Sequence, residues 1–238
     1  MAIASMITIS RQLGSGGSYI GQLVANRLGY AFIDRQIIQQ AARELGVEEA
    51  IVEDRDGRLQ TFWEKLVEAF ANGAPLGSYT PPPLNLVSDE ELVDTEHRLI
   101  TELAAKGPCV VLGRGAFHLL RGKGRLLNIM IHAPMRFRVE RLMSIYHVKS
   151  GDEAVRMIER SDRDRLGYIR TLTDLDWFDA RNYHLTIDTG QIDFATAEGI
   201  IASLAGQLPT EEEWPWVSEP VSDTTVSHER GPGDEGEK

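Results

Sequence analysis

Five short apolar runs constrain the fold of this chain more than any other feature of its sequence. Most of their positions are apolar, and each run is too short to form a helix of its own, which is typical of a strand buried on both faces. The runs are Ala4–Ile9, Tyr30–Ile33, Cys109–Leu112, Leu126–Ile131 and His184–Ile187. Apolar residues at helical spacing follow the first, fourth and fifth runs, within residues 19–28, 137–145 and 197–204. Strands that alternate with helices predict parallel βαβ units.

This alternation predicts an α/β fold of three layers, in which helices cover both faces of a central parallel five-stranded sheet. The stretch from 47 to 107 interrupts the alternation, and we expect a helical insertion between strands two and three. Helices are expected near Leu59–Ala71 and over Ser88–Ala105, where Ser88 and Glu91 fit the first turn of a capped helix. Such a long insertion indicates a lid or a binding subdomain, with an ordinary surface elaboration as the alternative.

The net charge of −11 is concentrated near the carboxyl end of the chain. Residues 209–238 hold nine acidic and two basic side chains and are rich in Pro, Gly and Ser, which predicts an acidic disordered tail. Residues 121–170 instead hold twelve basic and six acidic side chains, so an anion has a place to bind despite the overall charge. The body of the chain as a whole is not basic, which argues against nucleic acid as a partner.

Composition also argues against a membrane protein and an exported one. No stretch approaches eighteen consecutive apolar residues, and the first ten residues lack the basic and apolar regions of a signal peptide. The single cysteine, Cys109, lies inside an apolar run and is expected to be a buried thiol rather than a nucleophile. The six histidines show no metal-ligand spacing. These features predict a cytoplasmic protein and leave its oligomeric state open.

A glycine-rich turn joins the first apolar run to the first helical segment, in the sequence ITISRQLGSGGSYIG. Glycines let successive backbone N–H groups point inward, and the positive end of the helix dipole adds to them, so the turn predicts a cradle for an anion. The residues expected to contact phosphate are Gly14, Ser15, Gly16, Gly17 and Ser18. A turn that merely closes the fold is the alternative.

This turn departs from the phosphate-binding loop pattern G-x-x-x-x-G-K-[ST] at two positions. Arg11 stands where the pattern has its first glycine, and Gly17 stands where it has the lysine that neutralises donor phosphates. The guanidinium group of Arg11 could supply the missing positive charge, since it binds phosphate well. Ser18 keeps the position whose hydroxyl binds Mg²⁺.

The chain resembles the cytidylate kinase-like family over most of residues 3–205. The resemblance rests on the turn described above, on a second strand that ends in Asp34, and on the motif Leu112-Gly-Arg-Gly115. It continues through the segment Ser161-Asp-Arg-Asp-Arg165 and through residues 177–189. It implies a kinase domain over 1–208, an acceptor-binding insertion over about 47–107 and a lid over about 150–182. It also implies ATP and Mg²⁺ as cofactors and small-molecule nucleotides as substrates, with CMP or dCMP as acceptor.

The resemblance also implies roles for several polar residues. Asp34 and Arg114 would bind the acceptor, and Arg138 would contact the donor phosphates. Arg163 and Arg165 would close over the transferring group from the lid. The alternatives are a helix N-cap for Asp34, a surface position for Arg114, and a solvated helix whose arginines pair with neighbouring acids for the lid. Bacterial cytidylate kinases typically carry acids where this chain has Leu112 and Gly115, so the resemblance leaves Asp34 as the candidate metal carboxylate.

Three functions remain open at this point. The first is ATP-dependent phosphoryl transfer to a nucleoside monophosphate, in which Arg11, Arg138, Arg163 and Arg165 would be catalytic. The second is a kinase of another small molecule, an alcohol or an acid, whose hydroxyl Asp34 would activate. The third is a nucleotide-binding regulatory protein with negligible turnover, which Gly17, Leu112 and Gly115 would explain.

Overall fold

The sheet has five strands, all parallel. The computed structural model describes residues 5–38 and 90–207. The strands are β1 (Ser5–Arg11), β2 (Ala31–Ile33), β3 (Cys109–Leu112), β4 (Arg125–His132) and β5 (Leu185–Asp188), in the spatial order β2-β3-β1-β4-β5. The predicted fold class is therefore confirmed, and the apolar runs locate every strand to within two residues at either end. The central position of β1 places the end of that strand between the ends of β3 and β4.

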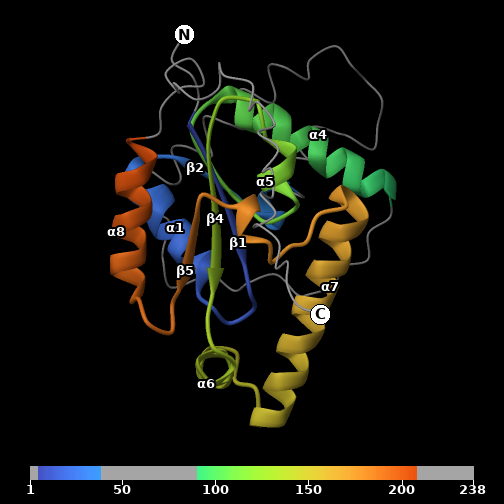
Figure 1. Ribbon diagram of the computed structural model, residues 1–238, viewed down its shortest axis with the longest axis vertical. Coiled ribbons are helices and arrows are strands. Elements are labelled where there is room, and N and C mark those ends of the chain that lie inside the picture. The colour runs from blue at the N-terminus through green and yellow to red at the C-terminus, as the bar shows by residue number, and fades with distance from the viewer. Residues whose placement is uncertain (1–4, 39–89, 208–238) are drawn as a thin grey trace, which may run out of the picture.

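Helices cover both faces of this sheet, which gives the three predicted layers (Figure 1). On one face lie α1 (Gly17–Leu28) and α8 (Phe194–Ala205), which also pack against each other. The opposite side carries α4 (Glu90–Lys106), α5 (Ala116–Leu119) and α7 (Gly151–Thr173). The helix α6 (Met135–Ile145) lies beyond the carboxyl end of β4 and packs against α7. Within the described part of the chain, no helix is long and apolar enough to cross a lipid bilayer.

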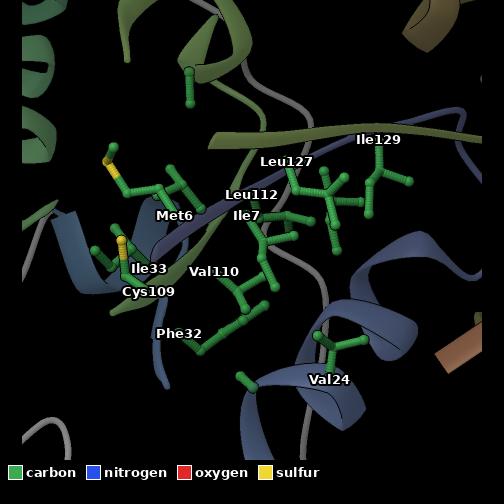
Figure 2. Packing of buried hydrophobic residues seen from close by; sticks show 14 of the residues in the cluster. Met6, Ile7, Val24, Phe32, Ile33, Cys109, Val110, Leu112, Leu127 and Ile129 are labelled. Atoms are coloured by element: carbon green, nitrogen blue, oxygen red, sulfur yellow. The ribbon is translucent and has the colours of Figure 1, made fainter. Parts of the chain in front are cut away.

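The main core cluster includes residues of the sheet, of α1 and α8 on one face, and of α4 and α5 on the other. Ile7 and Ile129 come from adjacent strands and are fully buried, and Val24 of α1 packs with them (Figure 2). Cys109 belongs to the same cluster, where burial raises the pKa of its thiol to about 12. The predicted buried, unreactive cysteine is therefore confirmed. Because the sheet is covered on both faces, its strands are apolar at consecutive positions.

The long helix α7 starts and ends at residues with clear local signals. Ser150 is the N-cap, and its hydroxyl accepts a hydrogen bond from the Glu153 N–H. Asp174 ends the helix in a left-handed conformation at φ 56°. The lid expected over about 150–182 therefore corresponds to a single 23-residue helix and a 3-10 turn, Ala180–Asn182. The helix expected near Leu59–Ala71 lies outside the described residues. The helix expected over Ser88–Ala105 corresponds to α4.

Candidate active site

The glycine-rich turn lies between β1 and α1, at the carboxyl edge of the sheet. Arg11 is the last residue of β1, and α1 begins at Gly17. The residue before the helix, Gly16, is left-handed at φ 83° and provides no side-chain hydrogen bond to the helix N-terminus. A helix N-terminus leaves its first N–H groups without intrahelical partners. The turn therefore has the backbone of an anion cradle.

Each glycine of the turn is in close contact with a side chain from another part of the chain. A Cβ atom at Gly14 would lie 2.8 Å from Cδ1 of Leu142 in α6. At Gly16 it would lie 2.5 Å from the ring of Phe194, and at Gly17 it would lie 2.5 Å from Cβ of Arg11. The glycines are therefore required by close packing on the outer side of the turn, in addition to its backbone conformation.

Hydrogen bonds from the neighbouring strands hold the turn in place. The Thr189 hydroxyl, which follows β5, donates to the carbonyl oxygen of Ser15 at 2.7 Å. Ser15 is itself fully buried, and its hydroxyl donates to the Gln12 carbonyl at 2.9 Å. The side chain of Ser15 thus points into the turn, so that only its backbone remains to contact a phosphate.

Helix α7 joins the turn through Asp162. This carboxylate accepts hydrogen bonds from the Leu13 backbone N–H at 3.3 Å and from the Gln12 side chain at 3.4 Å. It also accepts from Nη1 of Arg138, a buried residue of α6, at 2.5 Å. Arg138 Nη1 lies 3.5 Å from the Leu13 carbonyl oxygen as well. A single carboxylate therefore fixes Arg138 beside the phosphate loop.

Arg165 lies one turn along the same helix and is also turned inward. Its side chain is only 16% exposed, and Nη1 lies 3.9 Å from Asp162. Among the described residues, this buried nitrogen has no hydrogen-bond partner. Burial, followed by the nearby Arg11 cation, lowers the pKa of Arg165 to about 9. The guanidinium is still charged at neutral pH, but its environment disfavours that charge, so a bound anion would relieve the cost.

The structure therefore brings together three of the four predicted catalytic arginines. Arg11, Arg138 and Arg165 interact electrostatically with one another beside Asp162. Arg163 faces the other way and is exposed. We call the turn at 14–18, with these three arginines and Asp162, the donor region.

A second group of charged residues lies at the ends of β2 and β3. Arg114 follows β3, and its Nη2 donates to Oε1 of Glu96 in α4 at 2.7 Å. Both side chains are buried, with 10% and 4% of their surface exposed. The predicted surface alternative for Arg114 is therefore wrong. Arg35 follows β2 and interacts electrostatically with both Arg114 and Glu96.

The backbone at Arg114 is held in a rarely adopted conformation. Its φ is 56°, and its neighbours Gly113 and Gly115 are also left-handed, at 74° and 67°. The left-handed region costs a non-glycine residue about 1–2 kcal/mol. Such strain is found where the surrounding structure over-determines a functional side chain. Here the Glu96 ion pair and the Tyr168 ring, whose centroid lies 5.9 Å from Arg114 Cζ, hold the arginine in place.

Glu96 has an electrostatic environment with opposing contributions. Burial raises the pKa of Glu96, while the Arg114 and Arg35 cations lower it by smaller amounts. Burial has the opposite effect on the neighbouring His97 and lowers its pKa. The Nε2 atom of His97 lies 3.4 Å from the Tyr168 hydroxyl. We call Arg35, Glu96, Arg114 and Tyr168 the acceptor region.

Asp34 lies beside the acceptor region, and its carboxylate accepts a hydrogen bond from the backbone. Its Oδ1 accepts a hydrogen bond from the Ile37 N–H at 3.0 Å, at the start of the helical residues 35–38. The carboxyl is almost fully buried. The geometry is that of a helix N-cap, as the structural alternative for this residue predicted.

An aromatic cluster borders the donor region on the side of α8. Phe194, the first residue of α8, lies 5.9 Å from Tyr19 and 6.4 Å from Phe137 between ring centroids. The guanidinium of Arg141, one turn after Arg138, lies over the Phe194 ring at 4.6 Å. The cluster combines flat apolar surfaces with a cation next to the phosphate loop.

Comparison with known proteins agrees with this geometry. The model of the cytidylate kinase-like family matches residues 6–191. This chain belongs to the cytidylate kinase-like family. No curated relative matches the sequence.

One solved structure supports the fold of this cytidylate kinase-like protein, and two others align less well. An uncharacterized protein from Eubacterium ventriosum ATCC 27560 is similar at a TM-score of 0.62 and 18% identity, covering 84% of this chain and 98% of that one. A shikimate kinase from Bacteroides thetaiotaomicron aligns at a TM-score of 0.47 and 13% identity, over 84% and 98% of the two chains. A gluconokinase from Sinorhizobium meliloti 1021 aligns at 0.40 and 15%, over 87% and 97%.

The described residues of this family member offer Mg²⁺ few ligands. Within residues 5–38 and 90–207, no group of three or more His, Cys, Asp or Glu side chains is arranged to hold a metal ion. Mg²⁺ in phosphate-transfer sites is held largely by substrate phosphates and water. The Ser18 hydroxyl at the start of α1 fits that arrangement, with the ion entering together with the nucleotide.

Sequence reasoning missed Asp162 and Glu96 as site residues of this cytidylate kinase-like chain, although the sequence carries a signal for each. Glu96 lies three, four and seven residues before Leu99, Ile100 and Leu103, which are all buried. Asp162 lies four residues after the buried Ile158 and has Arg165 on the same face. A carboxylate on the apolar face of a helix must be paired, because an isolated buried charge is costly. That rule would have pointed to both residues.

Proposed function

We propose that the protein transfers the γ-phosphoryl group of ATP to a nucleoside monophosphate, with CMP or dCMP as the acceptor. The observation that carries the proposal is the donor region, where three arginines and one carboxylate surround a glycine-rich anion cradle. Phosphoryl transfer needs little covalent chemistry from a protein and depends on positioning and on positive charge. A buried cation whose charge is disfavoured by its environment, as at Arg165, is suited to that task.

The donor triphosphate would lie over residues 14–18. Backbone N–H groups of the turn and of the first turn of α1 would hold its β-phosphate. Arg138 and Arg165, fixed by Asp162, would bind the γ-phosphate oxygens on which charge develops during transfer. Mg²⁺, bound with the nucleotide and contacted by the Ser18 hydroxyl, would neutralise phosphate charge.

The acceptor would lie at the ends of β2 and β3. Arg35 and Arg114 offer two cations there, which favours an acceptor that carries an anion. An ionised phosphate oxygen of the acceptor attacks the γ-phosphorus, the bond to the β,γ-bridging oxygen breaks, and the electron pair leaves with ADP. No protein base is needed for this step. The engagement of Asp34 as an N-cap favours this reaction over activation of a neutral hydroxyl.

The donor base would stack at the aromatic cluster. Phe194 and Arg141 present a flat ring and a planar cation, and both surfaces stack well on nucleobases. The cluster borders the phosphate loop directly, since the Phe194 ring is packed against Gly16. The preference for a cytosine acceptor rests on the family resemblance alone.

The test is ADP release from ATP and Mg²⁺ with CMP, dCMP, UMP, AMP, GMP and gluconate, together with a blank that contains no acceptor. We expect turnover well above the blank with CMP or dCMP. Turnover with gluconate and with none of the nucleotides would mean that the acceptor is a small hydroxyl compound rather than a nucleoside monophosphate. Silence across the panel with intact ATP binding by calorimetry would refute the monophosphate kinase and leave a kinase of another acceptor or a nucleotide-binding regulator.

A further inference from the structure

Arg11 takes up the space that a lysine side chain at position 17 would need. A Cβ atom at Gly17 would lie 2.5 Å from Cβ and 3.1 Å from Cγ of Arg11, and 3.3 Å from Cβ of Ile131. Atoms so close to the backbone cannot swing aside as the end of a long side chain can. A side chain at position 17 and the arginine at position 11 therefore exclude each other.

The other end of the Arg11 side chain reaches the acceptor region. Nη1 of Arg11 lies against Gly113, where a Cβ atom would clash with it, and Cζ would lie 3.4 Å from that Cβ. Gly113 follows β3 and directly precedes Arg114. Because β1 and β3 are neighbours in the sheet, the arginine crosses from one strand end to the next. Its stem thus lies on the donor turn and its charge lies at the acceptor loop.

We propose that Arg11 is a bridging cation that replaces the lysine of the phosphate loop and also contacts the group in transfer. Gly17 and Gly113 form its seat: Gly17 leaves room for the stem of the arginine, and Gly113, which is left-handed at φ 74°, leaves room for its guanidinium group. The proposal deepens the proposed phosphotransferase and rests on it. It also explains how a loop without lysine has a cation nearby: Arg11 lies close enough to the inward-facing Arg165 to interact with it electrostatically.

Binding of inorganic tripolyphosphate tests the donor half of this proposal without involving a base or an acceptor. Calorimetry at one fixed ionic strength would compare the wild type with Arg11→Met, which removes the charge and keeps an apolar stem. We expect binding to weaken about 10- to 100-fold, the range for one charge-assisted hydrogen bond. Arg136→Met is the matched control, because that side chain is 90% exposed on α6, and its binding should be unchanged.

An exchange of the two positions tests the seat. Gly17→Lys alone should weaken tripolyphosphate binding at least 10-fold, because its Cβ would displace Arg11. The double variant Arg11→Gly/Gly17→Lys should bind within about threefold of the wild type, since the clash is gone and a lysine is restored. If the double variant binds no better than Arg11→Gly, the hypothesis that a lysine at position 17 can replace Arg11 is refuted. Arg11→Lys serves as a second probe if Gly17→Lys does not fold, and it should retain most of the binding.

Turnover separates the bridging role from simple charge replacement. The double variant should recover phosphate binding and yet turn over at least 10-fold more slowly than the wild type, because a lysine at position 17 starts from the donor side and does not reach Gly113. Full recovery of turnover by the double variant would mean that Arg11 acts only on the donor phosphates, and it would refute the bridging role. Wild-type binding by a folded Arg11→Met would overturn the whole inference. Failure of the wild type itself to bind ATP or tripolyphosphate would instead refute the proposed function.

Discussion

The donor and acceptor regions treat buried arginine in opposite ways. In the donor region, Arg138 and Arg165 share Asp162, and burial together with the Arg11 and Arg138 cations disfavours the charge of Arg165. In the acceptor region, Arg114 forms a close ion pair with Glu96, and the two form a compact unit under the Tyr168 ring. The donor region therefore contains, at Arg165, a cation whose environment disfavours its charge. The acceptor region holds an arginine in one orientation with much of its charge already balanced.

The difference indicates that the donor region binds its ligand mainly through positive charge. The acceptor region instead binds mainly through the fixed orientation of its arginine. A buried guanidinium with a hydrogen-bonded partner stays in one place, whereas one without enough partners gains most from a ligand that brings negative charge. Removal of an arginine should therefore affect the two regions differently.

The largest expected effect follows from removing Arg138. Arg138→Met should lower kcat by about a thousandfold, the scale found when a group that stabilises transition-state charge is lost. The measurement is acceptor-dependent ADP release, with circular dichroism to establish that the variant is folded. A loss below threefold in a folded variant would contradict the assignment of this residue to the donor region.

Removing the carboxylate of the acceptor region should instead reduce stability. Glu96→Leu leaves the side chain of Arg114 without the carboxylate that it pairs with, and we expect a loss of about 3 kcal/mol in the free energy of unfolding. Glu96→Gln keeps a hydrogen-bond acceptor for Arg114 and should lose less than half as much. Urea unfolding measures both variants. Equal losses would mean that the negative charge, rather than the position of the arginine, is what matters.

The donor region should show the reverse behaviour. Arg165→Leu removes a buried cation that lies close to two others, so the unliganded protein should gain about 1 kcal/mol of stability. Its affinity for tripolyphosphate should fall at the same time. A melting curve without ligand gives the first quantity and calorimetry gives the second. A variant that is both less stable and unchanged in binding would reverse our interpretation of the donor region.

A smaller effect is expected from pH. Burial raises the pKa of Glu96 in the folded state above its unfolded value, so the folded state favours the protonated form. The stability of the wild type relative to Glu96→Gln should therefore be greatest below the unfolded pKa and decrease as the pH rises through the folded one. Urea unfolding of the two proteins between pH 4 and 8 measures the difference. A constant difference would show that the carboxyl titrates normally.

The smallest effect is expected from Arg163, which the resemblance grouped with Arg165. Its side chain is exposed on α7, while Arg165 faces inward. Arg163→Ala should change kcat by less than about twofold, whereas Arg165→Ala should lower it by at least tenfold. Comparable losses would mean that α7 turns its exposed face toward the substrate during turnover.

The sequence predicted the fold because strand burial is a local property. A strand covered on both faces is apolar at successive positions, and that pattern located β3 without error. The site was predicted only in part, since the identity of a partner depends on contacts between distant segments. Leu13 and Asp162 are 149 positions apart, and nothing local to Asp162 indicates which loop it will bind. Asp34 illustrates the opposite case, because its local role as an N-cap was foreseen as the alternative to binding.

The mutual exclusion of Arg11 and a side chain at position 17 has a consequence for how such a loop can change over time. Starting from this chain, a lysine at 17 alone meets the arginine stem, and a glycine at 11 alone leaves the loop without its cation. On the proposed role of Arg11, both single-step intermediates are expected to bind phosphate more weakly than either the lysine form or the arginine form. A lineage that carries one form is expected to keep it, and the residue pair at 11 and 17 should then be inherited as one unit.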